Sequence, residues 1–292
     1  MGCSRTVIVH YGDPTPTVAL ANQLAEFDTD VVVVANDRST RPDTLGPHAV
    51  WQVPERNLGY GLAFMAAVRD CTSRACVVLN TDLVIDKRTF NRCLDVLFSA
   101  PDVGVVGPVL HYADGALQSG AGTFRRWRRA PSARTSPGPV PAECQWVTGA
   151  AMFIRLEVVR TVGMDGSYFL GSEDADLCLR ATRAGWRVLC CGDAPATHYG
   201  GRVIAGPRWS YYATRNRIWF VRTHFGVLPS ALNWLWSLAL LPRVIVADVI
   251  KRRSLLSSRL TVMALLHALW SKPDAAHGPL AAEPIPARIM RW

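Results

Sequence analysis

Residues 6–39 read TVIVHYGDPTPTVALANQLAEFDTDVVVVANDRS, with an apolar run on each side of a helical pattern. The first run, 6–10, is rich in β-branched residues and stops at a turn signal that contains Gly12 and Pro14. The second run, 30–35, stops at a polar segment. This order of strand, helix and strand predicts a βαβ unit with parallel strands.

Polar side chains follow both of these predicted strands. Tyr11 and Asp13 come after the first, and Asn36 and Asp37 come after the second. Apolar runs without alternation suit a parallel sheet that is covered on both faces, and such sheets bind ligands beyond the carboxyl ends of their strands. The sequence therefore predicts a ligand site at this edge of the sheet.

The rest of the chain continues the α/β pattern. Further strands are predicted at 48–53, 76–79, 103–110, 146–155 and 186–190. Further helices are predicted at 62–69, 90–98, 173–185 and 208–225. The glycines of the NLGYG stretch, 57–61, permit a ligand to approach the backbone closely. They form neither a GxGxxG motif nor a phosphate-binding P-loop, which removes the main support for a dinucleotide-binding protein or a P-loop NTPase.

Two further segments contain candidate ligands. Asn80-Thr81-Asp82 follows the predicted strand 76–79, a suitable place for a hard divalent cation with oxygen ligands. An Asn and Asp pair is equally typical of a turn. His198 lies in a glycine-rich loop after another predicted strand, where it is either a ligand or a structural residue.

The acidic stretch GSEDADLCLR, 171–180, places Glu173, Asp174 and Asp176 in the first turn of a predicted helix, with Ser172 as the expected N-cap. The positive end of the helix dipole favours anions there, so these residues need no functional role. The alternative is that one of them takes a proton in a reaction. The other segments of the chain favour Asp174 for that role.

Composition limits the class of protein. The chain has 292 residues, of which 49% are hydrophobic and 19% charged, as in ordered globular proteins. Its net charge of +9 favours phosphorylated ligands or acidic lipids, while no helix-turn-helix or zinc pattern indicates nucleic-acid binding. The eight cysteines include no CxxC pair, and the N-terminus lacks the apolar core of a signal peptide. We therefore expect reduced thiols and a cytoplasmic protein.

Two segments depart from the α/β pattern. Residues 111–145 are rich in arginine, glycine and proline and are expected to form a mobile insertion. Its basic cluster 125–129, which includes Trp127, either holds an anionic or lipid-linked substrate or is a solvated loop. Residues 272–292, with repeated alanine and proline, are expected to be a loose tail.

The apolar stretch 227–241 ends at Pro242 and is shorter than the ~20 residues that span a bilayer. Its tryptophans and the basic residues 251–253 indicate an element that docks on a membrane surface, here the inner face of the cytoplasmic membrane. A packing surface or a homodimer interface is the alternative.

Eight segments between residues 5 and 225 resemble, in order, the motifs of the inverting family 2 glycosyltransferases with the GT-A fold, especially the rhamnosyltransferase-like branch. They are VIVHYG, VVVVANDRS, ERNLGYG, VVLNTD, WVTGAAMFIR, FLGSEDADLCLRATRAGWRV, THYGG and YYATRNR. The resemblance implies a Rossmann-like, mixed and mostly parallel sheet flanked by helices. It also implies a catalytic domain over 1–225 and a helical, apolar and basic extension over 226–292.

The resemblance further implies a role for each polar segment. The base that takes the acceptor proton would be Asp174. The residues that would shape the site or contact the acceptor are Trp146, Gly149, Glu173 and Asp176. The residues that would bind a nucleoside-diphosphate sugar are Tyr11, Asp13, Asp37, Asn57, Asn80 and Thr81. The residues that would bind Mg²⁺ or Mn²⁺ against the diphosphate are Asp82 and His198.

The chemistry of sugar transfer suits these assignments. A leaving diphosphate needs its charge neutralised, and the attacking hydroxyl needs a carboxylate close to its proton. The implied reaction moves a rhamnose-like deoxysugar or another hexose from a dTDP-, UDP- or GDP-linked donor to a lipid-linked or cell-envelope glycan. A soluble natural product as the acceptor, and a non-enzymatic module that binds a nucleotide sugar, are the alternatives.

Overall fold

A computed structural model of the chain describes residues 3–135, 138–200, 207–252 and 254–270. The predicted tail, 272–292, lies outside these residues. The chain divides into two compact units. The sheet unit consists of Met1–Thr123, Ser132–Asp165 and Glu173–Val203, and the helical unit consists of Phe124–Pro131, Gly166–Ser172 and Ile204–Trp292. The helical unit thus takes in two segments that precede residue 225.

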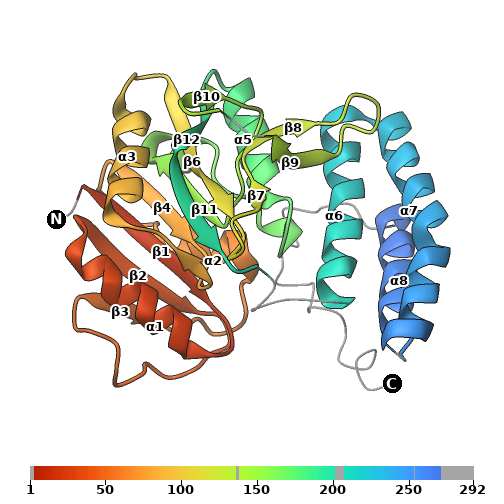
Figure 1. Ribbon diagram of the computed structural model, residues 1–292, viewed down its shortest axis with the longest axis horizontal. Coiled ribbons are helices and arrows are strands. Elements are labelled where there is room, and N and C mark those ends of the chain that lie inside the picture. Colours follow the sequence, from red (N-terminus) through yellow and green to blue (C-terminus); the bar gives the residue numbers. More distant parts are fainter. Residues whose placement is uncertain (1–2, 136–137, 201–206, 253, 271–292) are drawn as a thin grey trace. The chain divides into compact units, whose positions relative to one another are not determined.

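The sheet unit is built on a ten-stranded sheet with the order β10-β12-β6-β11-β4-β1-β2-β3, to which β5 and β7 add short pairings (Figure 1). The strands of the main path are β1 (Ser4–His10), β2 (Thr29–Ala35), β3 (Ala49–Gln52), β4 (Ala75–Leu79), β6 (Val103–His111), β10 (Pro141–Glu143), β11 (Ala151–Arg155) and β12 (Arg187–His198). Strand β1 is parallel to both β2 and β4, whereas β11 runs antiparallel between β4 and β6. The sheet is therefore mixed and mostly parallel, as predicted.

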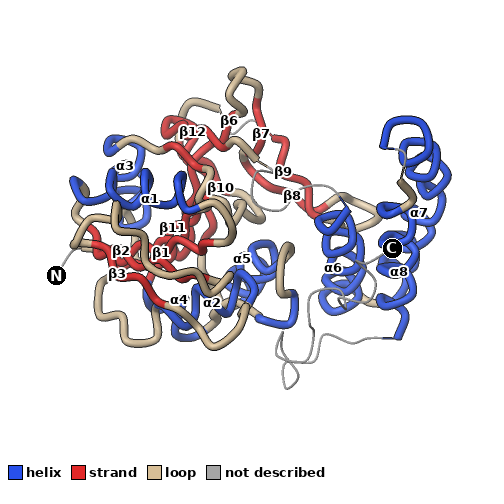
Figure 2. Tube along the Cα trace, turned by 90° about the horizontal axis from the view of Figure 1, so that it is seen from below, coloured by secondary structure: helices blue, strands red, loops and turns tan. Residues whose placement is uncertain are grey.

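Helices cover both faces of this sheet. They are α1 (Pro14–Gln23), α2 (Gly59–Ala67), α3 (Lys87–Phe98), α4 (Leu156–Thr161) and α5 (Glu173–Arg183). Figure 2 shows α1 and α3 on one face, and α2, α4 and α5 on the other. On the first face, Phe90 packs edge to face against Phe27 and Phe153, with ring centroids 5.2 and 5.1 Å apart. Burial on both faces explains why the central strands are continuously apolar.

The segment 111–145, expected as a mobile insertion, contains four short strands, β7 (Leu117–Ser119), β8 (Ala121–Phe124), β9 (Pro131–Thr135) and β10. Gly122 pairs with Trp146, and its N–H donates to the Trp146 carbonyl at 2.9 Å. A Cβ at Gly122 would lie 2.4 Å from that carbonyl oxygen, so only glycine fits there. The predicted strand 146–155 is wrong in its first half, because regular pairing starts at Ala151.

The helical unit contains α6 (Pro207–Phe225), α7 (Val227–Ala247), a π-helical turn (Asp248–Arg252) and α8 (Leu256–Trp270). The prediction that the apolar stretch ends at Pro242 is wrong, since α7 continues through this proline. Proline removes one helical hydrogen bond, but α7 packs on both α6 and α8. Residues Val227–Ile250 are consequently long and apolar enough to cross a membrane by length and composition.

Candidate active site

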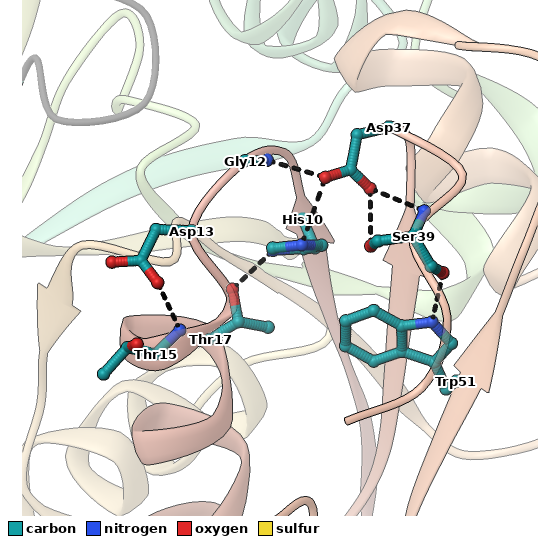
Figure 3. Close-up of polar contacts among 8 residues, drawn as sticks. All are labelled: His10, Gly12, Asp13, Thr15, Thr17, Asp37, Ser39 and Trp51. Carbon is teal, nitrogen blue, oxygen red and sulfur yellow. Dashed lines mark hydrogen bonds and ion pairs between the residues drawn. The ribbon is translucent and has the colours of Figure 1, made fainter. Parts of the chain in front are cut away.

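Asp37, at the end of β2, accepts three hydrogen bonds (Figure 3). Its Oδ2 accepts from the Gly12 N–H at 2.8 Å, and its Oδ1 accepts from the N–H and the hydroxyl of Ser39 at 3.1 and 2.7 Å. Burial acts to raise the pKa of Asp37, but the hydrogen bonds from Ser39 and Gly12 outweigh it and hold this pKa below its ordinary value. Asp37 is therefore a carboxylate that joins the carboxyl ends of β1 and β2.

His10, the last residue of β1, supports Asp37 from the interior. Its side chain is fully buried, with Nδ1 2.8 Å from the Thr17 hydroxyl and Nε2 3.4 Å from Asp37 Oδ2. Its ring also packs on Trp51, whose indole N–H donates to the Ser39 carbonyl (Figure 3). Burial lowers the pKa of His10, against the effect of Asp37 and Asp13. The sequence analysis gives His10 no role beyond the end of a predicted strand. A histidine as the last residue of an apolar, buried run is nevertheless a sign of a buried polar contact.

The other residues predicted to bind the donor near these strands differ in their hydrogen bonds and in their exposure. Asp13 is exposed and caps α1 by accepting from the Thr15 N–H at 2.9 Å, a bond that lowers the pKa of Asp13. Asn57 accepts from the Gly59 N–H at 2.9 Å within its own turn. Tyr11 is half-buried. These three residues lie beside the strand ends, and two of them also hold local turns.

Asn36 is buried at the end of β2. The sequence predicted its position at the carboxyl ends of the strands but assigned it no role. Its Oδ1 accepts from the Leu58 N–H at 3.2 Å, and its Nδ2 donates to the Gly59 carbonyl at 2.8 Å. The NLGYG segment is therefore fastened to the end of β2. This bond sets where α2 begins.

The predicted metal ligands Asp82 and His198 lie together, although they are far apart in sequence. Short β5 (Leu83–Val84) pairs antiparallel with the end of β12, and this pairing aligns His198 with Leu83. His198 Nε2 lies 3.0 Å from Asp82 Oδ1 and 3.2 Å from Asn80 Nδ2. Thr81, between the two, is buried.

His198 is held on its other side by β7. Its Nδ1 lies 2.7 Å from Gln118 Oε1. An imidazole nitrogen and a carboxylate oxygen are both groups that divalent cations bind. Within the described ranges, no group of three or more His, Cys, Asp or Glu residues gathers to hold a metal. The pair therefore supplies two ligands, from side chains that are 13% and 3% exposed, and an ion there would take its other ligands from a substrate.

Asp174, in the first turn of α5, is held by two backbone donors. Its Oδ2 accepts from the Gly149 N–H at 2.9 Å, and its Oδ1 accepts from the Ala175 N–H at 2.7 Å. Burial raises the pKa of Asp174, and although these hydrogen bonds act against it, the net shift is upward. The residue is only partly buried. A carboxylate of raised basicity that solvent still reaches is suited to take a proton.

Gly149 is positioned for this contact by Tyr60 on α2. The Tyr60 hydroxyl donates to the Gly149 carbonyl at 2.6 Å, and a Cβ at Gly149 would meet both Tyr60 and Asp174 at 3.4 Å. Burial, followed by the charges of Glu173, Asp174 and Asp82, raises the pKa of Tyr60 well above its ordinary value. The next residue, Ala150, accepts from the Asn80 N–H at 2.9 Å. This bond links the Asp174 side of the site to the Asp82 side.

The neighbours of Asp174 are buried. Asp176 accepts from Arg180 Nε at 2.7 Å, and the same guanidinium donates to the Val162 and Gly163 carbonyls at 2.6 and 2.8 Å. Asp176 thereby anchors α5 to the turn after α4. Glu173 is 5% exposed. Ser172, expected as the N-cap, has a φ of 81°, outside the extended region usual for that position.

Trp146 is a buried side chain between β10 and β11. Its indole N–H donates to the Thr123 carbonyl at 3.3 Å, and its backbone pairs with Gly122. It therefore fixes the course of the chain that leads to Gly149.

Asn216 of α6 performs a structural task that sequence reasoning missed. It is fully buried, and its Nδ2 donates to the carbonyls of Tyr168, Leu170 and Gly171 at 2.8, 2.9 and 2.7 Å. Arg215 adds a bond to the Tyr168 carbonyl at 3.1 Å. These contacts, all within the helical unit, hold the segment that leads along the chain into Glu173.

Replacing Asn216 by aspartate tests this clamp. A carboxylate cannot donate to three carbonyl oxygens, so Asn216→Asp should lower the free energy of unfolding by at least about 2 kcal/mol. The same change at exposed Asn91 on α3 is the matched control and should have little effect. Urea denaturation measures both, and equal stabilities of the two variants would contradict the clamp.

Comparison with known proteins places this geometry in a family. The sequence profile described as "Glycosyltransferase like family 2" matches residues 15–220. The O-antigen biosynthesis protein RfbC of Myxococcus xanthus is 26% identical over an alignment of 208 residues, and the match covers 63% of this chain and 16% of RfbC. The chain thus spans only a small part of the length of that relative.

Solved structures show the same fold. The mannosyltransferase PcManGT from Pyrobaculum calidifontis, in complex with GDP-Man and Mn²⁺, matches with a TM-score of 0.58 at 14% identity, covering 92% of this chain and 87% of that one. S. aureus TarS 1-349 in complex with UDP-GlcNAc matches with a TM-score of 0.52 at 15% identity, covering 91% of this chain and 81% of that one. The sheet and its covering helices form the GT-A fold. This chain belongs to glycosyltransferase family 2.

Proposed function

We propose that the chain is an inverting glycosyltransferase that moves a sugar from a nucleoside-diphosphate donor to a hydroxyl of a lipid-linked or cell-envelope glycan. The carboxylate of Asp174, fixed by two backbone N–H groups on a residue that is only partly buried, is the observation that carries the proposal. Family membership supplies the class of reaction. The likeness to an O-antigen biosynthesis protein supports the class of acceptor.

Asp174 acts as the general base. Its oxygens keep one lone pair each beyond those used by Gly149 and Ala175, and one of these takes the proton of the acceptor hydroxyl. The hydroxyl oxygen forms a bond to the anomeric carbon while the bond to the diphosphate breaks. A single displacement inverts the configuration at that carbon. Because a diphosphate leaves without needing a proton, one carboxylate is sufficient.

Asp82 and His198 would hold Mg²⁺ or Mn²⁺, since a carboxylate oxygen and an imidazole nitrogen lie 3.0 Å apart there. The ion would neutralise charge on the diphosphate. Asn80 steadies His198, and Thr81 lies between Asn80 and Asp82, where the backbone turns out of β4. Mn²⁺ in the mannosyltransferase from Pyrobaculum calidifontis supports the choice of a divalent cation.

The donor nucleoside would lie at the ends of β1 and β2, near Tyr11, Asp13, Asp37 and Asn57. Asp37, whose pKa is held low, is a permanent acceptor for donor N–H or O–H groups. A rhamnose-like deoxysugar or another hexose on a dTDP, UDP or GDP carrier is the proposed donor. Nucleotide sugars form in the cytoplasm, so we place the reaction there.

Asp174→Asn is the direct test of the base. The amide cannot take a proton, so turnover should fall by about 10²–10⁴-fold while donor binding is retained. In the wild type the rate should fall as the pH drops through the raised pKa of Asp174, and should be level above it. This acid limb should therefore lie above the ordinary aspartate pKa of about 3.9.

A screen of UDP-, dTDP- and GDP-sugars identifies the donor. Initial rates with that donor across pH then measure the loss of turnover and the acid limb. Asp95→Asn, at an exposed position of α3, is the control and should keep wild-type turnover. Full turnover in Asp174→Asn would exclude this base. Absence of binding to every nucleotide sugar would exclude the function.

Asp82→Asn tests the cation site. Loss of the charged ligand should raise the Mn²⁺ concentration needed for half-maximal nucleoside-diphosphate binding by at least about ten-fold. Isothermal titration of Mn²⁺ in the presence of the nucleoside diphosphate gives this value without turnover. Asp114→Asn, in an exposed turn, is the control. An unchanged Mn²⁺ requirement in Asp82→Asn would place the ion elsewhere.

A further inference from the structure

Apart from the exposed Arg243, helix α7 buries its polar residues, and it exposes most of its large apolar ones. Ser230, Asn233 and Ser237, spaced three and four residues apart, are 5% exposed or less. Leu228 is 73% exposed and Ile250, in the turn after α7, is 71%. The other exposed apolar side chains from 227 to 250 are Val227, Leu232, Leu235, Trp236, Leu238, Ile245, Val246 and Val249. A helix that packs on a protein in water sorts its residues the opposite way.

The buried polar residues bond within the helical unit. Ser230 donates to the Ile218 carbonyl of α6 at 3.1 Å, and Ser237 donates to the Asn233 carbonyl at 2.8 Å. Arg217 of α6 donates to the Ser237 hydroxyl at 2.7 Å. Small and polar residues between helices, with apolar residues outside, are typical of helices that face lipid.

Helix α8 follows this sorting only in part. Ser257, Ser258 and Thr261 are buried, and Val262, Leu266 and Leu269 are exposed. The apolar side chains that α8 buries against α6 are Leu260, Ala264, Leu265 and Ala268. Figure 1 shows α7 and α8 lying side by side. The inverted sorting is therefore a property of α7, and α8 adds three exposed apolar side chains to the same unit.

Basic and aromatic residues adjoin this apolar surface. Arg128 lies over the Trp236 ring of α7, 4.5 Å from its centroid, and the Arg128 carbonyl accepts from Asn233 Nδ2. The loop of residues 125–129 also exposes Trp127, at 73%. Arginine with tryptophan at the margin of an apolar surface is typical of the interface between lipid headgroups and acyl chains.

Negative charge is almost absent from the described segments of the same unit. In the segments 124–131, 166–172, 207–252 and 254–270, Asp248 is the only acidic residue. It is fully buried and accepts from the N–H and hydroxyl of Ser258 at 2.7 and 2.8 Å. The exposed surface of these segments is therefore apolar and positive, complementary to an anionic bilayer.

We propose that the helical unit docks in one leaflet of an anionic membrane. The exposed side of α7 meets the acyl chains, and the arginines of 125–129 meet the lipid phosphates. A second copy of this chain is a poorer occupant, because the described segments of its helical unit would present the same arginines and no exposed carboxylate. The proposal concerns where the enzyme works and does not rest on the identity of its base or donor.

Sedimentation with vesicles tests the apolar contact. The full-length protein should pellet with vesicles of phosphatidylglycerol and phosphatidylcholine, and much less with phosphatidylcholine alone. Leu235→Glu combined with Val246→Glu, both at exposed positions, should lower the partition coefficient at least about ten-fold. Val53→Glu combined with Val140→Glu makes the same change at exposed positions of the sheet unit and should leave binding unchanged.

Charge reversal tests the headgroup contact. Arg125→Glu combined with Arg126→Glu should weaken binding to the anionic vesicles by roughly five-fold or more per charge and reduce its dependence on salt. Circular dichroism and nucleotide-sugar binding should match the wild type, which shows that the fold is intact.

Three results would overturn the proposal. They are wild-type protein that stays in the supernatant, unchanged pelleting of the Leu235→Glu and Val246→Glu variant, and loss of a wild-type dimer in that variant without any vesicle binding. The last would identify a second copy of the chain as the occupant. None of the three uses donor or acceptor, so they leave the proposed transfer reaction to its own tests.

Discussion

The two hydrogen bonds to Asp174 are the constraint on which the geometry of the site depends. One donor, Ala175, comes from the helix that carries the aspartate, and the other, Gly149, comes from the turn before β11. Tyr60 holds that turn from α2, and Asp176 holds the helix through Arg180. A charged carboxylate is stable at the start of a helix, and partial burial there increases its affinity for a proton. One arrangement therefore both places the base and sets its basicity.

The strands could be predicted because a covered parallel sheet requires continuous apolar runs, and 6–10 and 30–35 are such runs. The end of the predicted strand 30–35 indicated Asp37 as a candidate ligand, and the end of the predicted strand 76–79 indicated Asp82. Other roles depend on contacts between residues far apart in the chain. The sequence does not show that His10 lies behind Asp37, or that Asn216 holds the carbonyls before α5. It also predicted a strand at 146–150, where apolar composition conceals a turn.

Helix α7 illustrates the same limit for an apolar segment. Composition shows that 227–241 is apolar, and it cannot show which residues face the protein. Proline at 242 was expected to end the stretch, but packing on α6 and α8 outweighs one lost hydrogen bond. Only the structure shows that Ser230, Asn233 and Ser237 face inward. The tryptophans and basic residues of this segment already predict membrane docking, and the burial of individual side chains adds which of them would face the lipid.

Direct displacement assisted by Asp174 is the central claim, and the stereochemistry of the product tests it most directly. The anomeric configuration is read from the coupling between the first two ring protons, or from the anomeric carbon–hydrogen coupling, by nuclear magnetic resonance. The account predicts that the new linkage has the opposite configuration to the donor in the first product formed. A product with the donor's configuration would require two displacements or a different mechanism, and would contradict a single base at Asp174.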